Sequence, residues 1–234
     1  MIYKSLGWRR VFLLSPLGAI GGVIGQIIFD LFNNYTDGIL SGFLVSIIIK
    51  PLNLFSPEGV NFWPSFDMAI FLFRWMLSTG AISLAFSIAL QLSNKRVAFI
   101  FFIGCLIGLI SWLATGYVVE FVPPDWYRFL TIPYMIHAVL PGILACFLLS
   151  LSIKEIRPFI SKFMLAGFLG GLLGTKLDLV STAIFIRHVD LINTFGRNIN
   201  VPRIVDAILV MFLINLICLS FLKESLKSKI SIIK

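Results

Sequence analysis

Ionisable side chains inside long apolar segments are the residues of this sequence best suited to chemistry. Placing a charged side chain in hydrocarbon costs roughly 2.5–3.5 kcal/mol on insertion scales, so such residues persist mainly where they pair, line a cavity or contact a substrate. A desolvated charge binds a polar solute more strongly than a solvated one. The candidate ligand-binding residues are Asp67, Arg74, His137, Lys176 and Asp178.

Two of these residues share one face of a predicted helix. Asp67 and Arg74 are seven residues apart, nearly one above the other, and Ser78 continues the stripe. The long stem of Arg74 can carry its charge to the membrane interface, so an interfacial anchor and a ligand clamp are both open interpretations. His137 precedes Pro141 by one turn, and the carbonyl group that the proline leaves unbonded is an alternative partner for it.

A second acid and base lie close together in the fifth apolar segment. Asp178 falls on the glycine-bearing face of the predicted helix, with Thr175 and Thr182 on the same stripe. Lys176 falls on the opposite side and cannot pair with Asp178 in a regular helix. Either Lys176 faces another neighbour, or the helix is broken near Gly174, and a broken helix at membrane depth usually lines a cavity.

Three further charged residues have structural interpretations. Arg203 and Asp206 follow Pro202 at a predicted helix start, where proline and an acid near the positive end of the helix dipole are both favourable. Their spacing also allows an ion pair within one helix. Asp30 closes the first apolar segment, so we expect it to be solvated.

Motifs for catalysis and metal binding are missing from the sequence. It contains no His-Glu-x-x-His, no Gly-x-Ser-x-Gly, no phosphate-binding glycine loop and no Asp-x-x-Asp pair. Cys105, Cys146 and Cys218 lie in three different apolar segments and are interpreted as small buried residues. We expect no metal and no cofactor. A non-enzyme is favoured, and an intramembrane enzyme built from scattered polar residues is the third functional interpretation.

Composition identifies the class of protein that holds these residues. The 234-residue chain is 59% hydrophobic and 13% charged, with a mean hydropathy of +0.99, which is too apolar for a soluble domain. The sequence predicts an all-α, polytopic membrane helix bundle that forms one domain over residues 1–234. The first apolar segment has no small-residue cleavage site and is interpreted as a retained helix.

Six segments have the length needed to span a membrane, about 20 apolar residues each. A seventh segment, residues 39–49, is too short to cross alone and ends in Lys50-Pro51, so we predict an interfacial or re-entrant helix. The predicted spans are residues 11–32, 67–92, 97–119, 129–153, 161–186 and 203–222.

Basic residues orient this bundle. If six segments span, four basic groups fall on one side, which the positive-inside rule makes cytoplasmic together with both termini. The candidate polar residues then share the outer half of the membrane. The asymmetry also accounts for most of the net charge of +8, and no basic, aromatic-interleaved surface indicates nucleic acid. The groups are Lys4, Arg9 and Arg10; Lys95 and Arg96; Lys154, Arg157 and Lys162; and Lys223, Lys227, Lys229 and Lys234.

Two predicted spans share the pattern G-x-x-G-G-x-x-G. The four glycines of each copy fall within an arc of roughly 100°, which leaves one helix face without side chains. Packing inside the bundle and docking of a partner protein are both open interpretations. Both copies run in the same direction, so an inverted-repeat transporter is not supported. The glycines are Gly18, Gly21, Gly22 and Gly25 in the first span, and Gly167, Gly170, Gly171 and Gly174 in the fifth.

The order of these features resembles the S components of energy-coupling-factor vitamin transporters. The six-span plan, the glycine-rich first helix followed by Asp30, and the stretch VPRIVD at residues 201–206 carry the resemblance. It implies capture of a vitamin near the outer membrane face and docking of a transmembrane coupling subunit on the first helix. Glycines in place of the Ala-x-x-x-Ala pair, and the long segment 33–66, depart from that family.

The sequence therefore favours small-solute capture or transport in the cytoplasmic membrane, through a polar pocket lined by the five candidate residues. The alternative is a non-catalytic membrane subunit of a larger complex that docks through its glycine-rich helix faces. The expected partners are membrane lipid, other membrane subunits and a small solute, and nucleic acid is not expected.

Overall fold

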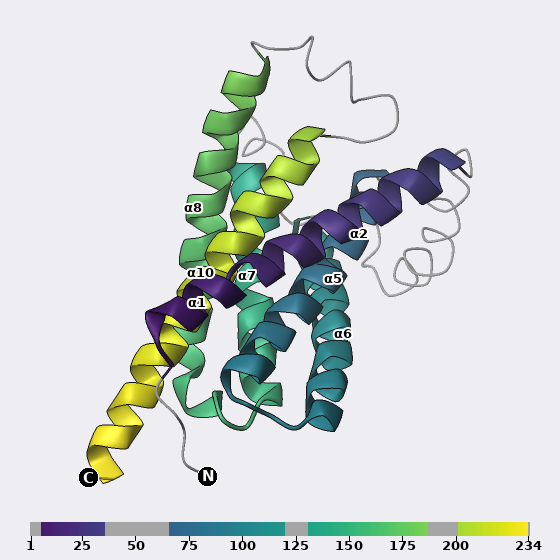
Figure 1. Ribbon diagram of the computed structural model, residues 1–234. Coiled ribbons are helices and arrows are strands. Elements are labelled where there is room, and N and C mark those ends of the chain that lie inside the picture. The colour runs from purple at the N-terminus through teal and green to yellow at the C-terminus, as the bar shows by residue number, and fades with distance from the viewer. Residues whose placement is uncertain (1–5, 36–65, 120–130, 187–200, 234) are drawn as a thin grey trace.

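The computed structural model describes residues 6–35, 66–119, 131–186 and 201–233, and this part of the chain is helical without a strand (Figure 1). The all-α class is confirmed. The predicted helix at residues 39–49 lies outside the described residues. The helices are α1 (Trp8–Leu14), α2 (Pro16–Tyr35), α5 (Phe66–Ala89), α6 (Asn94–Val119), α7 (Thr131–Ser152), the 3-10 helix η3 (Arg157–Phe159), α8 (Ile160–Ile186) and α10 (Val201–Ile233).

Most helix bounds follow the apolar segments of the sequence. α8 covers Ile160–Ile186, where residues 161–186 are predicted. α10 differs, because it continues past the predicted end at residue 222 to Ile233. The first of the added turns contains Lys223, Glu224, Leu226 and Lys227, which are residue types that favour a helix.

Five helical segments of the described chain are long and apolar enough to cross a membrane. α7 contributes a shorter apolar stretch, Ala138–Ser152, so its crossing stays a prediction. The five segments are Trp8–Leu31, Leu72–Ala89, Asn94–Thr115, Arg157–Leu177 and Ile204–Lys227.

The distribution of side chains agrees with a membrane bundle. On α6, Phe99, Phe102, Leu106 and Ile110 are all exposed and form one stripe at three- and four-residue spacing. Many serines and threonines are buried instead, together with Asp30 and Arg74, the latter at 2% exposure. Apolar side chains outside and polar groups inside are the arrangement that a lipid environment favours.

The six long helices of the described chain form a closed ring. α5 packs on α6, α6 on α7, α7 on α8, α8 on α10, α10 on α2, and α2 on α5. Side chains fill the inside of the ring, where the rings of Phe86 from α5 and Phe163 from α8 meet edge to face at 5.4 Å. The last helix therefore lies between the first and the fifth long helices, which are far from each other in sequence.

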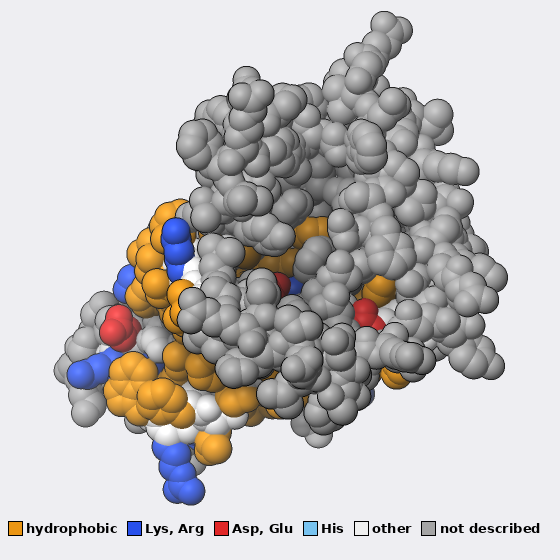
Figure 2. All heavy atoms as spheres, turned by 90° about the horizontal axis from the view of Figure 1, so that it is seen from above, with side chains coloured by type: hydrophobic (Ala, Val, Ile, Leu, Met, Phe, Trp, Pro, Cys, Tyr) orange, Lys and Arg blue, Asp and Glu red, His pale blue; other side chains and the backbone are white. Residues whose placement is uncertain are grey.

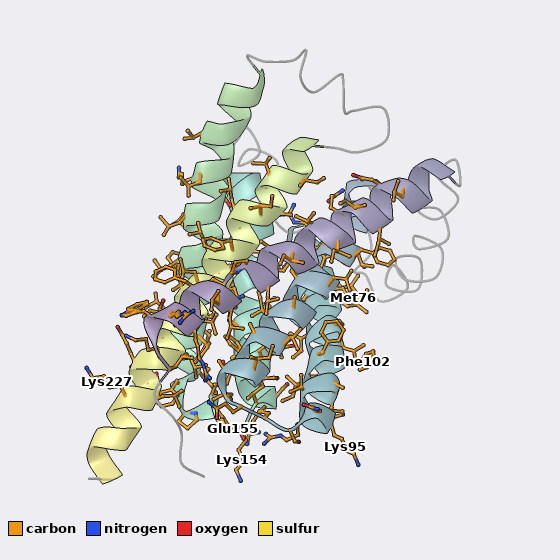
Figure 3. The ribbon with its side chains drawn as sticks, viewed as in Figure 1. Met76, Lys95, Phe102, Lys154, Glu155 and Lys227 are labelled. Carbon is orange, nitrogen blue, oxygen red and sulfur yellow. The ribbon has the colours of Figure 1, made fainter. Side chains whose placement is uncertain are left out.

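Both termini lie at one end of the ring, with the α5–α6 and α7–α8 connections (Figure 1). Lys95, Lys154 and Lys227, from three of the four basic groups, are at this end (Figure 3). Arg96 donates two hydrogen bonds to Glu155, at 2.8 and 3.0 Å, and joins the two connections. We call this the basic end.

The first predicted span is divided into α1 and α2. Pro16 has no N–H to continue the helix, and the Ser15 hydroxyl donates to the Val11 carbonyl oxygen at 2.7 Å. The side-chain amide of Asn215, from α10, donates to the carbonyl oxygens of Leu14 and Ser15 at 3.0 Å each. This buried amide therefore fixes the junction of α1 and α2 against α10.

Candidate functional site

The glycine motif of α2 holds this helix against two neighbours. Gly21 and Gly25 face α5, and a Cβ atom on Gly21 would lie 2.5 Å from the carbonyl oxygen of Leu77. Gly18 lies against α10, and Gly22 lies where α5 and α10 meet. A side chain at these positions would force the helix backbones apart.

The motif of α8 divides in the same way. Gly167 and Gly171 face α7, whereas Gly170 and Gly174 face α10. A Cβ atom on Gly174 would lie 2.6 Å from the Cα atom of Val210. In both copies, helices of the same chain cover the glycine faces. This arrangement agrees with the interpretation that the motif serves packing inside the bundle. These faces present no open surface to a partner protein.

The close approach of α2, α5 and α10 brings five polar residues together. We call them the polar layer: Gln26 and Asp30 from α2, Arg74 and Ser78 from α5, and Asp206 from α10. Arg74 forms an ion pair with Asp206 through Nη2 and Oδ2. Gln26 donates a hydrogen bond to Asp30 at 2.9 Å. Seen from the end opposite the termini, acidic and basic side chains lie side by side inside the bundle (Figure 2).

Backbone contacts show that these residues share one depth in the bundle. A Cβ atom on Gly22 would lie 2.7 Å from the Ser78 hydroxyl and 3.4 Å from the Ala207 Cβ atom. A Cβ atom on Gly25 would lie 2.8 Å from the Cα atom of Arg74. Gln26 directly follows Gly25 and Asp206 directly precedes Ala207, whereas Asp30 lies one turn beyond Gln26.

Burial differs across the ion pair. The Arg74 side chain is 3% exposed and the Asp206 side chain is 24% exposed. A buried ion pair gains little net stability over apolar residues of the same size, because both charges lose their hydration. The ion pair therefore explains little of the stability of the fold. Of its two side chains, Asp206 is the more exposed.

Two polar atoms of the layer lack a hydrogen-bond partner among the described residues, the Gln26 Oε1 atom and the Ser78 hydroxyl. Ser87, another buried serine of α5, does have a partner: its hydroxyl donates to the Ser83 carbonyl oxygen one turn back at 2.8 Å. A buried polar group without a partner costs about 1–3 kcal/mol. The layer thus holds a buried amide oxygen and a buried hydroxyl whose hydrogen-bonding capacity no described residue uses.

The structure brings one of the predicted ligand-binding residues, Arg74, into this layer. Asp67 lies in α5, His137 in α7 and Asp178 in α8, but their side chains lie outside the described part of the structure. Lys176 is exposed on α8, away from the polar layer. α8 runs without interruption from Ile160 to Ile186, so the structure excludes one of the two alternatives, a helix broken near Gly174, and Lys176 is exposed on a regular helix.

Two members of the layer were assigned other roles by the sequence. From the sequence, Asp206 is interpreted as a residue of the helix start that could pair with Arg203. In the structure it lies beyond the first turn of α10 and pairs with Arg74 on another helix. Asp30 is 8% exposed and accepts the hydrogen bond from Gln26, so the expectation that it is solvated is wrong. The glutamine four residues before it was the available signal.

The described thiols form one close pair. The Sγ atoms of Cys146 and Cys218 lie 3.5 Å apart inside the bundle, and Cys105 lies on α6. Among the described residues, no three His, Cys, Asp or Glu side chains are grouped so that they could hold a metal ion.

Comparisons of the chain with protein-family models, curated proteins and solved structures found no match. The fold and the polar layer define the class: a helical membrane bundle with an ion pair in its interior.

Proposed function

We propose that this protein captures or transports a small polar solute, which binds at the polar layer between α2, α5 and α10. The observation that carries the proposal is the buried Arg74–Asp206 ion pair beside two polar atoms without partners, on Gln26 and Ser78. A structural ion pair explains the first two residues but leaves the other two unexplained. Charges at membrane depth mark substrate or ion pathways more often than packing sites.

The chemistry of the layer favours a solute with both donors and acceptors. A guanidinium donates, whereas a carboxylate and an amide oxygen accept, and a hydroxyl does both. A neutral hydrocarbon would leave the Gln26 amide oxygen and the Ser78 hydroxyl without a hydrogen-bond partner. Vitamins, amino acids and nucleobases have the required mixture of groups, and a vitamin is the class that the resemblance to S components implies.

We place the solute site toward the outer face of the membrane. Arg74 precedes the part of α5 that leads to the basic end, which the positive-inside rule makes cytoplasmic. Asp67 lies two turns before Arg74 on the same helix. Asp67, His137 and Asp178 stay candidate ligand-binding residues in this proposal.

The test is ligand-dependent stability of the purified protein. Thermal unfolding in detergent is measured across a panel of vitamins, amino acids and nucleobases, and native mass spectrometry identifies any retained solute. A ligand at a hundredfold excess over its dissociation constant should stabilise the fold by about 2.7 kcal/mol.

A pair of matched variants makes this test specific. Ser78→Ala removes a hydroxyl without a partner and should leave the unliganded protein stable while weakening the ligand effect. Ser87→Ala removes a buried hydroxyl on the same helix that already has a partner, so it should cost about 0.5–1.5 kcal/mol and leave the ligand effect intact. A panel without any response, or equal losses in both variants, would contradict the proposal.

A further inference from the structure

One corner of the basic end exposes cations and aromatic side chains together. α1 packs against α10 and exposes Arg9 and Arg10. The same short helix exposes Trp8 by 49%, Phe12 by 58% and Leu13 by 68%. In water, so much apolar surface on seven residues would be unfavourable, so this helix is suited to the boundary between lipid chains and headgroups.

α10 adds further cations to the same place. The Lys223 Nζ atom lies 3.9 Å from the centroid of the Trp8 ring, a cation–π contact. Lys227 follows one turn later and is exposed, and Glu224 is the acidic residue between them. We call this site the basic-aromatic corner, and it consists of Trp8, Arg9, Arg10, Phe12, Lys223 and Lys227.

The position of the corner matches the edge of the apolar part of the bundle. Of the segments able to span a membrane, the first begins at Trp8 and the last ends at Lys227. The two helices are antiparallel, because α1 and α2 lead away from the basic end and α10 returns to it (Figure 1). The corner therefore lies at one membrane surface, with apolar side chains beside its charges.

We infer that the basic-aromatic corner binds the phosphodiester headgroup of an anionic phospholipid. Arginine guanidinium groups match phosphate oxygens in a bidentate geometry, and basic sites between helices at the membrane surface are suited to anionic headgroups. Trp8 and Phe12 would contact the glycerol and the first acyl carbons of the same lipid. This inference is independent of the solute site, because that site lies near Asp206 at the other end of α10.

Other cations of the basic end are less suited to this role. Arg96 is held by two hydrogen bonds to Glu155. Arg157 donates to the Leu151 carbonyl oxygen at 2.8 Å through Nη2. Lys95 and Lys154 are exposed at the same end and provide a matched control.

The experiment compares lipid binding by two double variants. Arg9→Gln with Arg10→Gln removes two charges from the corner, and Lys95→Gln with Lys154→Gln removes two charges elsewhere at the same end. Full-length protein in a neutral detergent is titrated with phosphatidylglycerol or with phosphatidylcholine, and bound lipid is counted by native mass spectrometry. The wild-type protein should prefer phosphatidylglycerol to phosphatidylcholine. The Arg9→Gln, Arg10→Gln variant should bind phosphatidylglycerol about thirtyfold more weakly, because it lacks two cations that are each attracted to an anionic surface.

The controls separate the corner from simpler explanations. The Lys95 and Lys154 variant should keep its lipid preference, and soluble glycerophosphoglycerol should not displace the lipid, because it lacks acyl chains. All four residues are exposed, so both variants should fold, and thermal unfolding without lipid checks this. Equal losses in both variants would show general charge attraction, and displacement by the soluble headgroup would show a site for free anions. Either result, or no lipid preference, would overturn the inference.

Discussion

The junction of α2, α5 and α10 and the junction of α7, α8 and α10 are built on the same glycine pattern but hold different side chains. In both, one glycine pair faces the neighbouring helix. The other pair of α8 faces α10, whereas in α2 Gly18 lies against α10 and Gly22 lies where α5 and α10 meet. The first junction encloses Arg74, Asp206 and the rest of the polar layer. The second encloses Val210, Ile214 and the thiols of Cys146 and Cys218. The glycines therefore set how closely helices pack, and the residues between them set whether the junction can bind a polar solute.

The largest expected difference between the junctions comes from removing one charge. Asp206→Asn leaves the guanidinium of Arg74 buried without its carboxylate, and breaking a buried pair in this way costs about 3–5 kcal/mol. Cys218→Ala, at the second junction, removes one thiol from an apolar contact and should cost clearly less. Denaturant unfolding of both variants in detergent measures the difference. Equal effects would show that the polar layer is no more sensitive to substitution than the apolar junction.

Adding a side chain to the glycine faces should have similar effects at both junctions. Gly21→Leu and Gly171→Leu each push a side chain into a facing helix backbone, and overpacking costs about 1–3 kcal/mol. Gly7→Leu is the matched control, because nothing lies within 4 Å of a Cβ atom at Gly7. Thermal unfolding of the three variants checks this. If only one of the two buried substitutions is destabilising, the two glycine motifs are not equivalent in packing.

A smaller effect concerns the Arg96–Glu155 ion pair, which joins the α5–α6 and α7–α8 connections. Partial burial raises the pKa of Glu155, but hydrogen bonds from Arg96 and the charges of Arg96 and Lys154 outweigh it and lower the pKa below its ordinary value. The pair therefore contributes stability above the pKa of Glu155 in the unfolded chain, and this stability is lost as pH falls through the lower pKa of the folded state.

Because Arg96 is 45% exposed, the contribution should be about 0.2–1 kcal/mol. The measurement is unfolding of the wild-type protein and of Glu155→Gln from neutral to acid pH. The difference between them should shrink as the solution becomes acidic, and it should also shrink in high salt. A difference that stays constant with pH would show that Glu155 contributes through packing and not through its charge.

The sequence predicted the helices better than it predicted which helices pack against one another. Apolar length and periodicity predict the helices, and the cost of a buried charge identifies Arg74 as unusual. The partner of Arg74 could not be found in this way, because it depends on α10 lying beside α2 and α5 at the closure of the ring. Asn215 was missed for the same reason, since its two acceptors belong to the other end of the chain.

The central claim is that the polar layer serves ligand binding more than stability, and the double variant Arg74→Met with Asp206→Leu tests it most directly. Replacing a buried ion pair by apolar residues of similar volume is often neutral or stabilising, so the variant should unfold near the wild-type temperature. It should also lose the stabilisation by the solute that the wild-type protein binds. A double variant that is strongly destabilised, or that keeps the full ligand effect, would contradict the account.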